Sequence, residues 1–320
     1  MVTLDDPNVR AALDADELPR MSFGDHLDEL RSRLVKSLLA IALVVVGVMP
    51  FKDAVQEIII APYRVQWRIG FLGHIDNLET KAAAATATGS ALDEDTERFV
   101  TYCRKHKDAI LAGKKEYSHL FPVNTGYPLP YSLYATGGLE DVMSWMWAAL
   151  VFALVLASPI VVWQLWAFIG AGLYAHERAV FYRYFPFMLV LMGAGVSFGY
   201  FAVLPYSLGF LVSMMNPDQV NAIFGIGQFL TLEFAMTGAM GLVFQLPLVM
   251  LALQRIGITP HEWYLKNWRM TILIIFIVAA VVTPPEPVSM LLMAGPMVLL
   301  FGLGLLLTRW QRPAVAKVLA

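Results

Sequence analysis

The stretch VMSWMWAALVFALVLASPIVVWQLWAFI, residues 142–169, carries no charged side chain. A transmembrane helix needs roughly 20 consecutive apolar residues, because each residue advances an α-helix by about 1.5 Å through roughly 30 Å of hydrocarbon. This stretch exceeds that length, and comparable apolar runs lie on both sides of it. The sequence therefore predicts an all-α membrane protein.

Five further apolar runs complete the membrane-spanning part of the predicted fold. Together with the first stretch they predict six transmembrane helices, over residues 34–51, 142–169, 185–212, 229–253, 270–283 and 288–308. The composition agrees, because 58% of the residues are hydrophobic and 15% are charged, whereas soluble proteins carry roughly 25% charged residues. The first run is not a cleavable signal, since the segment before it is long and rich in Asp and Glu.

The orientation of these helices follows from Lys and Arg in the short loops, which remain on the cytoplasmic side. Basic residues occupy three of the connecting or terminal segments, namely 170–184, 254–269 and 309–320. The alternate connections carry acidic residues as their only charges, namely Asp218 in 213–228 and Glu286 in 284–287. We therefore expect both termini, including the segment 1–33, in the cytoplasm, and residues 52–141 as an enlarged first periplasmic loop.

The enlarged loop is expected to form a small external cap. Its small residues 82–89 predict a low-complexity linker, and Ser90 with Asp93 has the spacing of a capping box that opens a helix. The apolar positions that follow predict a helix through Phe99, Val100, Cys103, Ile110 and Leu111. We expect Gly113 to end this helix and the Pro- and Gly-rich remainder to be irregular. Cys103 is the only cysteine, which excludes an intramolecular disulfide.

Two of the predicted spans have features that affect packing. The fifth holds about 13 apolar residues, which at about 1.5 Å each reach roughly 20 Å. Either this helix thins the bilayer or packs against other protein, or Trp263, Tyr264 and Trp268 extend it at the interface. In the third span, small residues would let a neighbouring helix approach closely, and these are Gly193, Gly195 and Gly199.

An amphipathic helix is predicted directly ahead of the first span. In the segment SFGDHLDELRSRL, residues 22–34, one helical face is apolar and consists of Phe23, Leu27, Leu30 and Leu34. The opposite face carries His26, Glu29 and Arg33, and the spacing of four between Glu29 and Arg33 suits an intrahelical ion pair. Periodicity alone therefore favours a structural role for these polar residues.

Four stretches together resemble the TatC family of twin-arginine protein translocases. They are His26–Leu34, which follows the pattern His-Leu-x-Glu-Leu-Arg-x-Arg-Leu, then Trp163–Ile169 with Leu173–Arg178, then Phe244–Pro247, and finally Thr283–Glu286. They occur in this order at boundaries of the predicted spans. The resemblance covers residues 21–64 and 131–310 and leaves most of the external segment unmatched.

The resemblance implies a signal-peptide receptor. In that family, cytoplasmic carboxylates at the positions of Glu29 and Glu177 receive the paired arginines of a signal peptide, and Arg31 belongs to the same motif. A guanidinium pairs with a carboxylate through two hydrogen bonds, which an ammonium group cannot do. Phe168 and Leu173 beside Glu177 would shield these pairs from water, although ordinary interfacial packing is the alternative for both. Without the resemblance, a solvated charge cluster would explain Glu177.

Four further residues are candidates for a role inside or beside the membrane. Glu233 is an acidic residue in the fourth span, for which a wet interfacial position is at least as good an explanation as a functional one. Gln245 occupies a position at which many family members carry glutamate, and a neutral amide can bond between helices but cannot take up a proton. Glu286 matches an acidic family position. Pro62 matches a family proline that we expect to shape the external segment.

The resemblance also implies partners and a location. It implies a core receptor subunit that works with single-span TatA- and TatB-type subunits, in the bacterial inner membrane, to export folded precursors by means of the proton-motive force. Membrane lipids and self-association are further expected contacts. A nucleic-acid partner is not expected, because the net charge is −2 and the basic residues are scattered.

Other functional classes lack their sequence signatures. A secondary transporter of a small solute or ion, the main alternative, would be expected to show internal repeats, broken helices and midplane polar residues. The sequence shows no convincing repeat and no charge at the middle of a span. An enzyme would need paired intramembrane catalytic residues, and no Gly-rich phosphate loop, His-Glu-x-x-His zinc pair or nucleophile elbow occurs in the sequence. We expect no catalytic residue, no metal site and no cofactor.

Overall fold

The computed structural model describes residues 23–88, 94–114, 127, 129–135, 137–171, 175–214, 225–255, 258–283 and 287–310. Within these ranges the regular structure is helical, and one isolated bridge joins Tyr134 to Gly225. Five helices are long and apolar enough to cross a membrane, and Trp268–Val282 is a shorter apolar helix. The predicted all-α membrane fold is therefore confirmed, with five long apolar helices and one short one.

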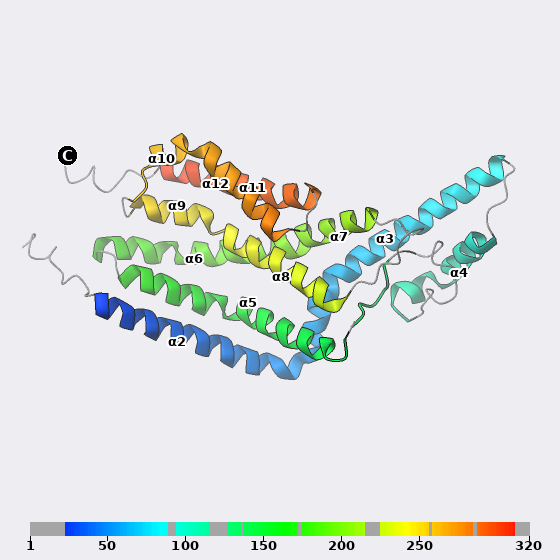
Figure 1. The fold of residues 1–320 in the computed structure, drawn as a ribbon, viewed down its shortest axis with the longest axis horizontal. Helices are drawn as coiled ribbons and strands as arrows, with labels where there is room; N and C mark the ends of the chain where they lie inside the picture. The colour runs from blue at the N-terminus through cyan, green and yellow to red at the C-terminus, as the bar shows by residue number, and fades with distance from the viewer. Residues whose placement is uncertain are drawn as a thin grey trace, which may run out of the picture.

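Helices follow one another along the whole described chain. They are α2 (Phe23–Val48), the 3₁₀ turn η1 (Met49–Phe51), α3 (Lys52–Thr88), α4 (Glu94–Leu111), α5 (Glu140–Ala171), α6 (Ala175–Phe198), the π-helical turn η2 (Gly199–Val203), α7 (Leu204–Ser213), α8 (Ile226–Val243), α9 (Leu246–Arg255), α10 (His261–Lys266), α11 (Trp268–Val282) and α12 (Pro287–Trp310). Figure 1 shows most of them side by side in a bundle, from which α3 and α4 project at the end opposite the start of α2.

The first long helix and the start of the external segment are nearly continuous. The predicted amphipathic helix is the first part of α2, and the chain bends at η1, which contains Pro50, before α3 begins. The 37 residues of α3 extend about 56 Å at 1.5 Å per residue. Buried side chains recur at every fourth position of α3, namely Val55, Ile59, Tyr63, Trp67, Phe71 and Ile75. This stripe packs the first part of α3 against α5 and α7.

The projecting part of α3 forms an arm together with α4. The linker predicted at 82–89 is wrong for Ala82–Thr88, which continues α3 because alanine is the best helix former. The predicted capping box of Ser90 and Asp93 lies outside the described residues. The predicted helix through Phe99, Val100, Cys103, Ile110 and Leu111 is confirmed as α4.

Gly113 ends α4 as predicted. Its φ is +69°, a conformation that side chains with a Cβ atom rarely adopt. Its amide donates to the Ile110 carbonyl, and the Lys114 amide donates to the Ala109 carbonyl. These bonds satisfy the last carbonyl groups of the helix. Upstream of this turn, Cys103 is fully buried on the face of α4 that packs against α3.

Two predicted spans are interrupted, and the fifth is short. The third contains η2 between α6 and α7, and the fourth breaks at Phe244 and Gln245 between α8 and α9. Pro247 explains the second break, because proline lacks an amide hydrogen and its ring clashes with the preceding turn. The 15 residues of α11 reach about 22 Å. Of the three aromatic residues considered as an extension, only Trp268 belongs to α11.

Glycines bring α6 and η2 close to α8. A Cβ atom added to Gly195 would lie 2.5 Å from the Met240 carbonyl oxygen, and one added to Gly199 would lie 2.8 Å from the Thr237 Cα atom. Both glycines therefore allow the close helix approach that we predicted for them. Gly193 does not, because a Cβ atom there would meet nothing within 4 Å.

This difference predicts opposite effects for the same substitution. We expect Gly195→Ala to lower the free energy of unfolding by about 1–3 kcal/mol, because the new methyl group overlaps backbone that must move. We expect Gly193→Ala to raise it by up to about 1 kcal/mol, because alanine is the better helix former. Thermal and denaturant unfolding of both variants in one detergent measures the difference. Equal effects would contradict the packing described for Gly195.

Candidate functional site

Polar side chains of α2 face the last turns of α5. The two helices lie side by side along much of their length (Figure 1). On the outer face of α2, Leu27, Leu30 and Leu34 are 49%, 41% and 55% exposed. His26, Glu29 and Arg33 on the other face are partly buried. The first turns of α2 therefore direct their polar face toward protein and leave the apolar face uncovered, as suits contact with lipid.

Glu29 and Arg33 form the predicted ion pair. Glu29 Oε1 lies 3.0 Å from Arg33 Nη2, and the two side chains are 18% and 23% exposed. The second terminal nitrogen, Arg33 Nη1, donates to Gln164 Oε1 of α5 at 3.1 Å. Glu29 Oε2 is buried and has no hydrogen-bond partner within the described part of the chain. One oxygen of this carboxylate is thus hydrogen-bonded, and the other is buried without a donor.

An aromatic contact closes the neighbouring side of this site. The His26 ring stacks on Phe168 of α5 with 4.5 Å between ring centroids and 26° between ring planes. Gln164 and Phe168 are four residues apart and so share one face of α5. This face of α5 meets the polar face of α2 at two successive helical turns. Gln164 lies within the motif Trp163–Ile169 and is the longest polar side chain in residues 142–169, but the sequence alone does not reveal its contact with α2.

The other predicted site residues are distributed as follows. Arg31 is exposed, and the ion pair of Glu29 is with Arg33 instead. Glu177 belongs to the first turn of α6, which starts four positions after α5 ends, but its side chain lies outside the description. Leu173, in the connection between these helices, and Glu286 lie outside the described residues. The structure brings Glu29 and Phe168 to the same end of the bundle, the end where α2 begins.

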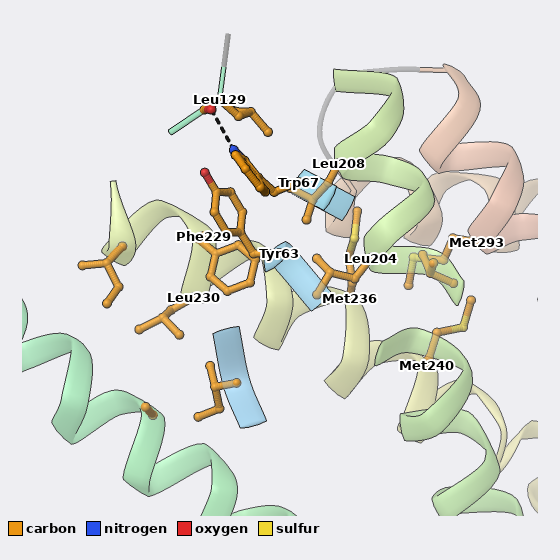
Figure 2. Close-up of a cluster of buried hydrophobic side chains, with 14 of the residues drawn as sticks. Tyr63, Trp67, Leu129, Leu204, Leu208, Phe229, Leu230, Met236, Met240 and Met293 are labelled. Carbon is orange, nitrogen blue, oxygen red and sulfur yellow. Dashed lines mark hydrogen bonds between the residues drawn. The ribbon is translucent and has the colours of Figure 1, made fainter. Parts of the chain in front are cut away.

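Glu233 is buried inside the bundle. Glu233 is 3% exposed, and its Oε2 atom has no hydrogen-bond partner in the described chain. Phe229, Met236 and Met240 of the same helix are fully buried around it, and Figure 2 shows these three beside side chains of α3 and α7. The wet interfacial position considered for Glu233 is therefore wrong, because this face of α8 points toward α3, η2 and α7.

Gln245 is half-buried and Pro62 is buried. The Gln245 amide donates to the Met188 carbonyl of α6 at 3.0 Å, and it does so at the break between α8 and α9. Gln245 thus bonds between helices, as a neutral amide can. Pro62 is a buried residue within α3 and does not interrupt that helix. Among the described residues, no group of three or more His, Cys, Asp and Glu side chains is arranged to hold a metal ion.

Comparison with known proteins identifies the family. The sequence model described as Sec-independent protein translocase protein (TatC) matches residues 25–296. The chain belongs to the TatC family. It is 33% identical to the TatC protein of Carboxydothermus hydrogenoformans over 175 residues, which cover 54% of this chain and 72% of the relative. It is 30% identical to the TatC protein of Koribacter versatilis over 304 residues, covering 92% and 88%.

The fold of the chain is also that of TatC. A crystal structure described as the twin arginine translocase receptor TatC superimposes with a TM-score of 0.62, covering 89% of this chain and 98% of that one at 22% identity. At this identity the likeness establishes a shared fold. Family and fold together make this chain a multi-pass membrane protein of the Sec-independent protein translocase, with a role in transport rather than in catalysis.

Proposed function

We propose that this chain is the core receptor subunit of the twin-arginine translocation system and binds twin-arginine signal peptides of folded precursors at Glu29 and Glu177. The observation that carries this proposal is the buried oxygen Glu29 Oε2, which has no donor in the described chain and lies in a shielded site at the end of the bundle where α2 begins. Glu177 belongs to the first turn of the helix that follows α5. Two carboxylates near one another would match two successive arginines.

Shielding matters for the strength of this recognition. A solvent-exposed ion pair contributes only about 0–1 kcal/mol, whereas a hydrogen bond to a charged group in a protected site contributes about 1.5–3 kcal/mol. Glu29 is mostly buried, and the stack of His26 on Phe168 covers its neighbourhood. We propose that Phe168, Leu173 and Arg31 complete the site by packing against the signal peptide and by shaping its charge.

The proposal includes an orientation and a set of partners. The distribution of Lys and Arg over the short connections supports a cytoplasmic position for the end where α2 begins and a periplasmic position for the arm of α3 and α4. In that orientation the site would face newly made precursors in the cytoplasm of a bacterium. TatA- and TatB-type single-span subunits would then assemble with the chain in the inner membrane for export driven by the proton-motive force.

Binding of two matched precursors tests the function. The purified chain in detergent is expected to retain a twin-arginine precursor and to bind the same precursor with twin lysine at least about tenfold more weakly, which corresponds to about 1.4 kcal/mol. The difference arises because lysine lacks the planar fork of hydrogen-bond donors. Co-purification and fluorescence titration measure both affinities. Equal affinities, or no binding of either precursor, would refute the proposed function.

A further inference from the structure

We propose that Gln164 keeps one oxygen of the Glu29 carboxylate unpaired, because it holds one terminal nitrogen of Arg33 and thereby leaves the buried Glu29 Oε2 to accept a hydrogen bond from a guanidinium of the signal peptide. Gln164 is thus a positioning residue of the receptor site. This inference rests on the proposed function and adds a residue from a second helix to it. The ligand is a peptide that carries arginine side chains.

Arg33 does not bind both oxygens of Glu29. A guanidinium can close an end-on fork on a carboxylate, in which its two terminal nitrogens bind the two oxygens. Here Nη2 lies 3.0 Å from Glu29 Oε1, but Nη1 donates to Gln164 Oε1 at 3.1 Å. The end-on fork is therefore not formed. Glu29 keeps a buried oxygen that has no hydrogen-bond partner in the described chain.

The lack of a donor makes the burial of Glu29 Oε2 unfavourable. A buried acceptor without a donor is unfavourable, and more so when it belongs to a charged group. A donor that arrives with a ligand removes this penalty, so the lack of a donor at Glu29 Oε2 favours binding. A neutral amide suits the task at position 164, because it accepts a hydrogen bond from Arg33 without competing with Glu29 for the positive charge.

Two contacts between α2 and α5 hold Gln164 beside Arg33. Arg33 and Gln164 belong to different helices, and the hydrogen bond between them joins residues that are 131 positions apart in the sequence. One turn further along α5, Phe168 stacks on His26 of α2. These two contacts fix the relative position of α2 and α5 at the site, which keeps Gln164 within reach of Arg33. The unpaired state of Glu29 Oε2 therefore follows from the way the two helices pack.

A double-mutant cycle tests the inference on the full chain in detergent, with a fluorescent twin-arginine precursor as the probe. We expect Gln164→Leu to weaken precursor binding about tenfold, because Arg33 is then free to close on both oxygens of Glu29. In the Arg33→Gln background, Gln164→Leu is expected to have no further effect. Gln164→Met repeats the measurement with a second side chain that lacks the amide.

A control substitution separates this effect from a general one. Gln228 is exposed in the first turn of α8, where the neighbouring Gly227 contacts Glu140 at the start of α5, so Gln228→Leu makes the same chemical change away from the site and should leave the affinity unchanged. The inference is overturned if both Gln164 variants bind like the unchanged chain, or if Gln164→Leu weakens binding equally with and without Arg33. In either case, preference of the unchanged chain for twin arginine over twin lysine would leave the proposed function intact.

Discussion

Replacement of both Glu29 and Glu177 with alanine is expected to abolish crosslinking of a twin-arginine precursor while the chain still inserts into the membrane. Each proposed pair contributes about 1.5–3 kcal/mol when it is shielded, so the loss of both would weaken binding by roughly a hundredfold or more. The Glu29→Gln and Glu177→Gln variants keep the size of each side chain and remove its charge, so together they should have nearly the same effect. Site-specific photo-crosslinking in membrane vesicles measures the result.

Two exposed glutamates provide the control for this experiment. Glu57 of α3 and Glu262 of α10 are exposed, and their joint replacement with alanine removes the same amount of charge from the chain. Crosslinking should then persist, because neither residue belongs to the proposed site. Undiminished crosslinking after replacement of Glu29 and Glu177 would mean that the signal peptide binds elsewhere.

Replacement of Trp67 with alanine is expected to produce the largest loss of stability. The Trp67 indole is fully buried, stacks on Phe71 with 4.8 Å between ring centroids, and meets Tyr131 edge-on at 5.0 Å. Its Nε1 donates to the Leu129 carbonyl at 3.0 Å, as Figure 2 shows. Loss of a buried Trp lowers the free energy of unfolding by about 3–5 kcal/mol. Thermal unfolding in detergent, followed by intrinsic fluorescence and by circular dichroism, measures this loss.

A second tryptophan shows whether burial is the cause. Trp147 of α5 is 59% exposed, so Trp147→Ala should change the free energy of unfolding by no more than about 0.5 kcal/mol. Trp67→Phe keeps an aromatic ring and removes the hydrogen bond, and it should therefore lie between the two alanine variants. If Trp67→Ala and Trp147→Ala had the same stability, Trp67 would not anchor α3 to the segment that precedes α5.

Hydropathy located the apolar helices but missed the long helix α3. The apolar runs are continuous in the spans, so their positions can be read directly from the sequence. In α3 charged residues precede the buried ones, at Lys52 and Asp53, or lie between them, at Glu57, Arg64 and Arg68, and they lower the average hydrophobicity. The recurrence of an apolar residue at every fourth position from Val55 to Ile75 was the available signal for a helix.

The site was predictable where its contacts are local. Glu29 and Arg33 are four residues apart on one helix, so their pairing follows from helical geometry. The bond from Arg33 to Gln164 depends on how α2 packs against α5, and no periodicity within either helix contains that information. The burial of Glu233 was missed for the same reason, because its distance from the start of α8 does not reveal which neighbouring helices cover it.

The buried cysteine of the arm makes the chain a convenient subject for chemical labelling. Cys103 is the only cysteine, and burial raises the pKa of its thiol to about 12. At neutral pH it therefore offers almost no thiolate, the form that reacts with maleimides. A cysteine introduced at Arg31 of α2 or at Gly138, which lies just before the start of α5, would be the one that takes up the reagent, because both positions are exposed. In the orientation proposed above, a membrane-impermeant maleimide added to intact cells should modify Gly138→Cys and spare Arg31→Cys, with the natural cysteine left in place.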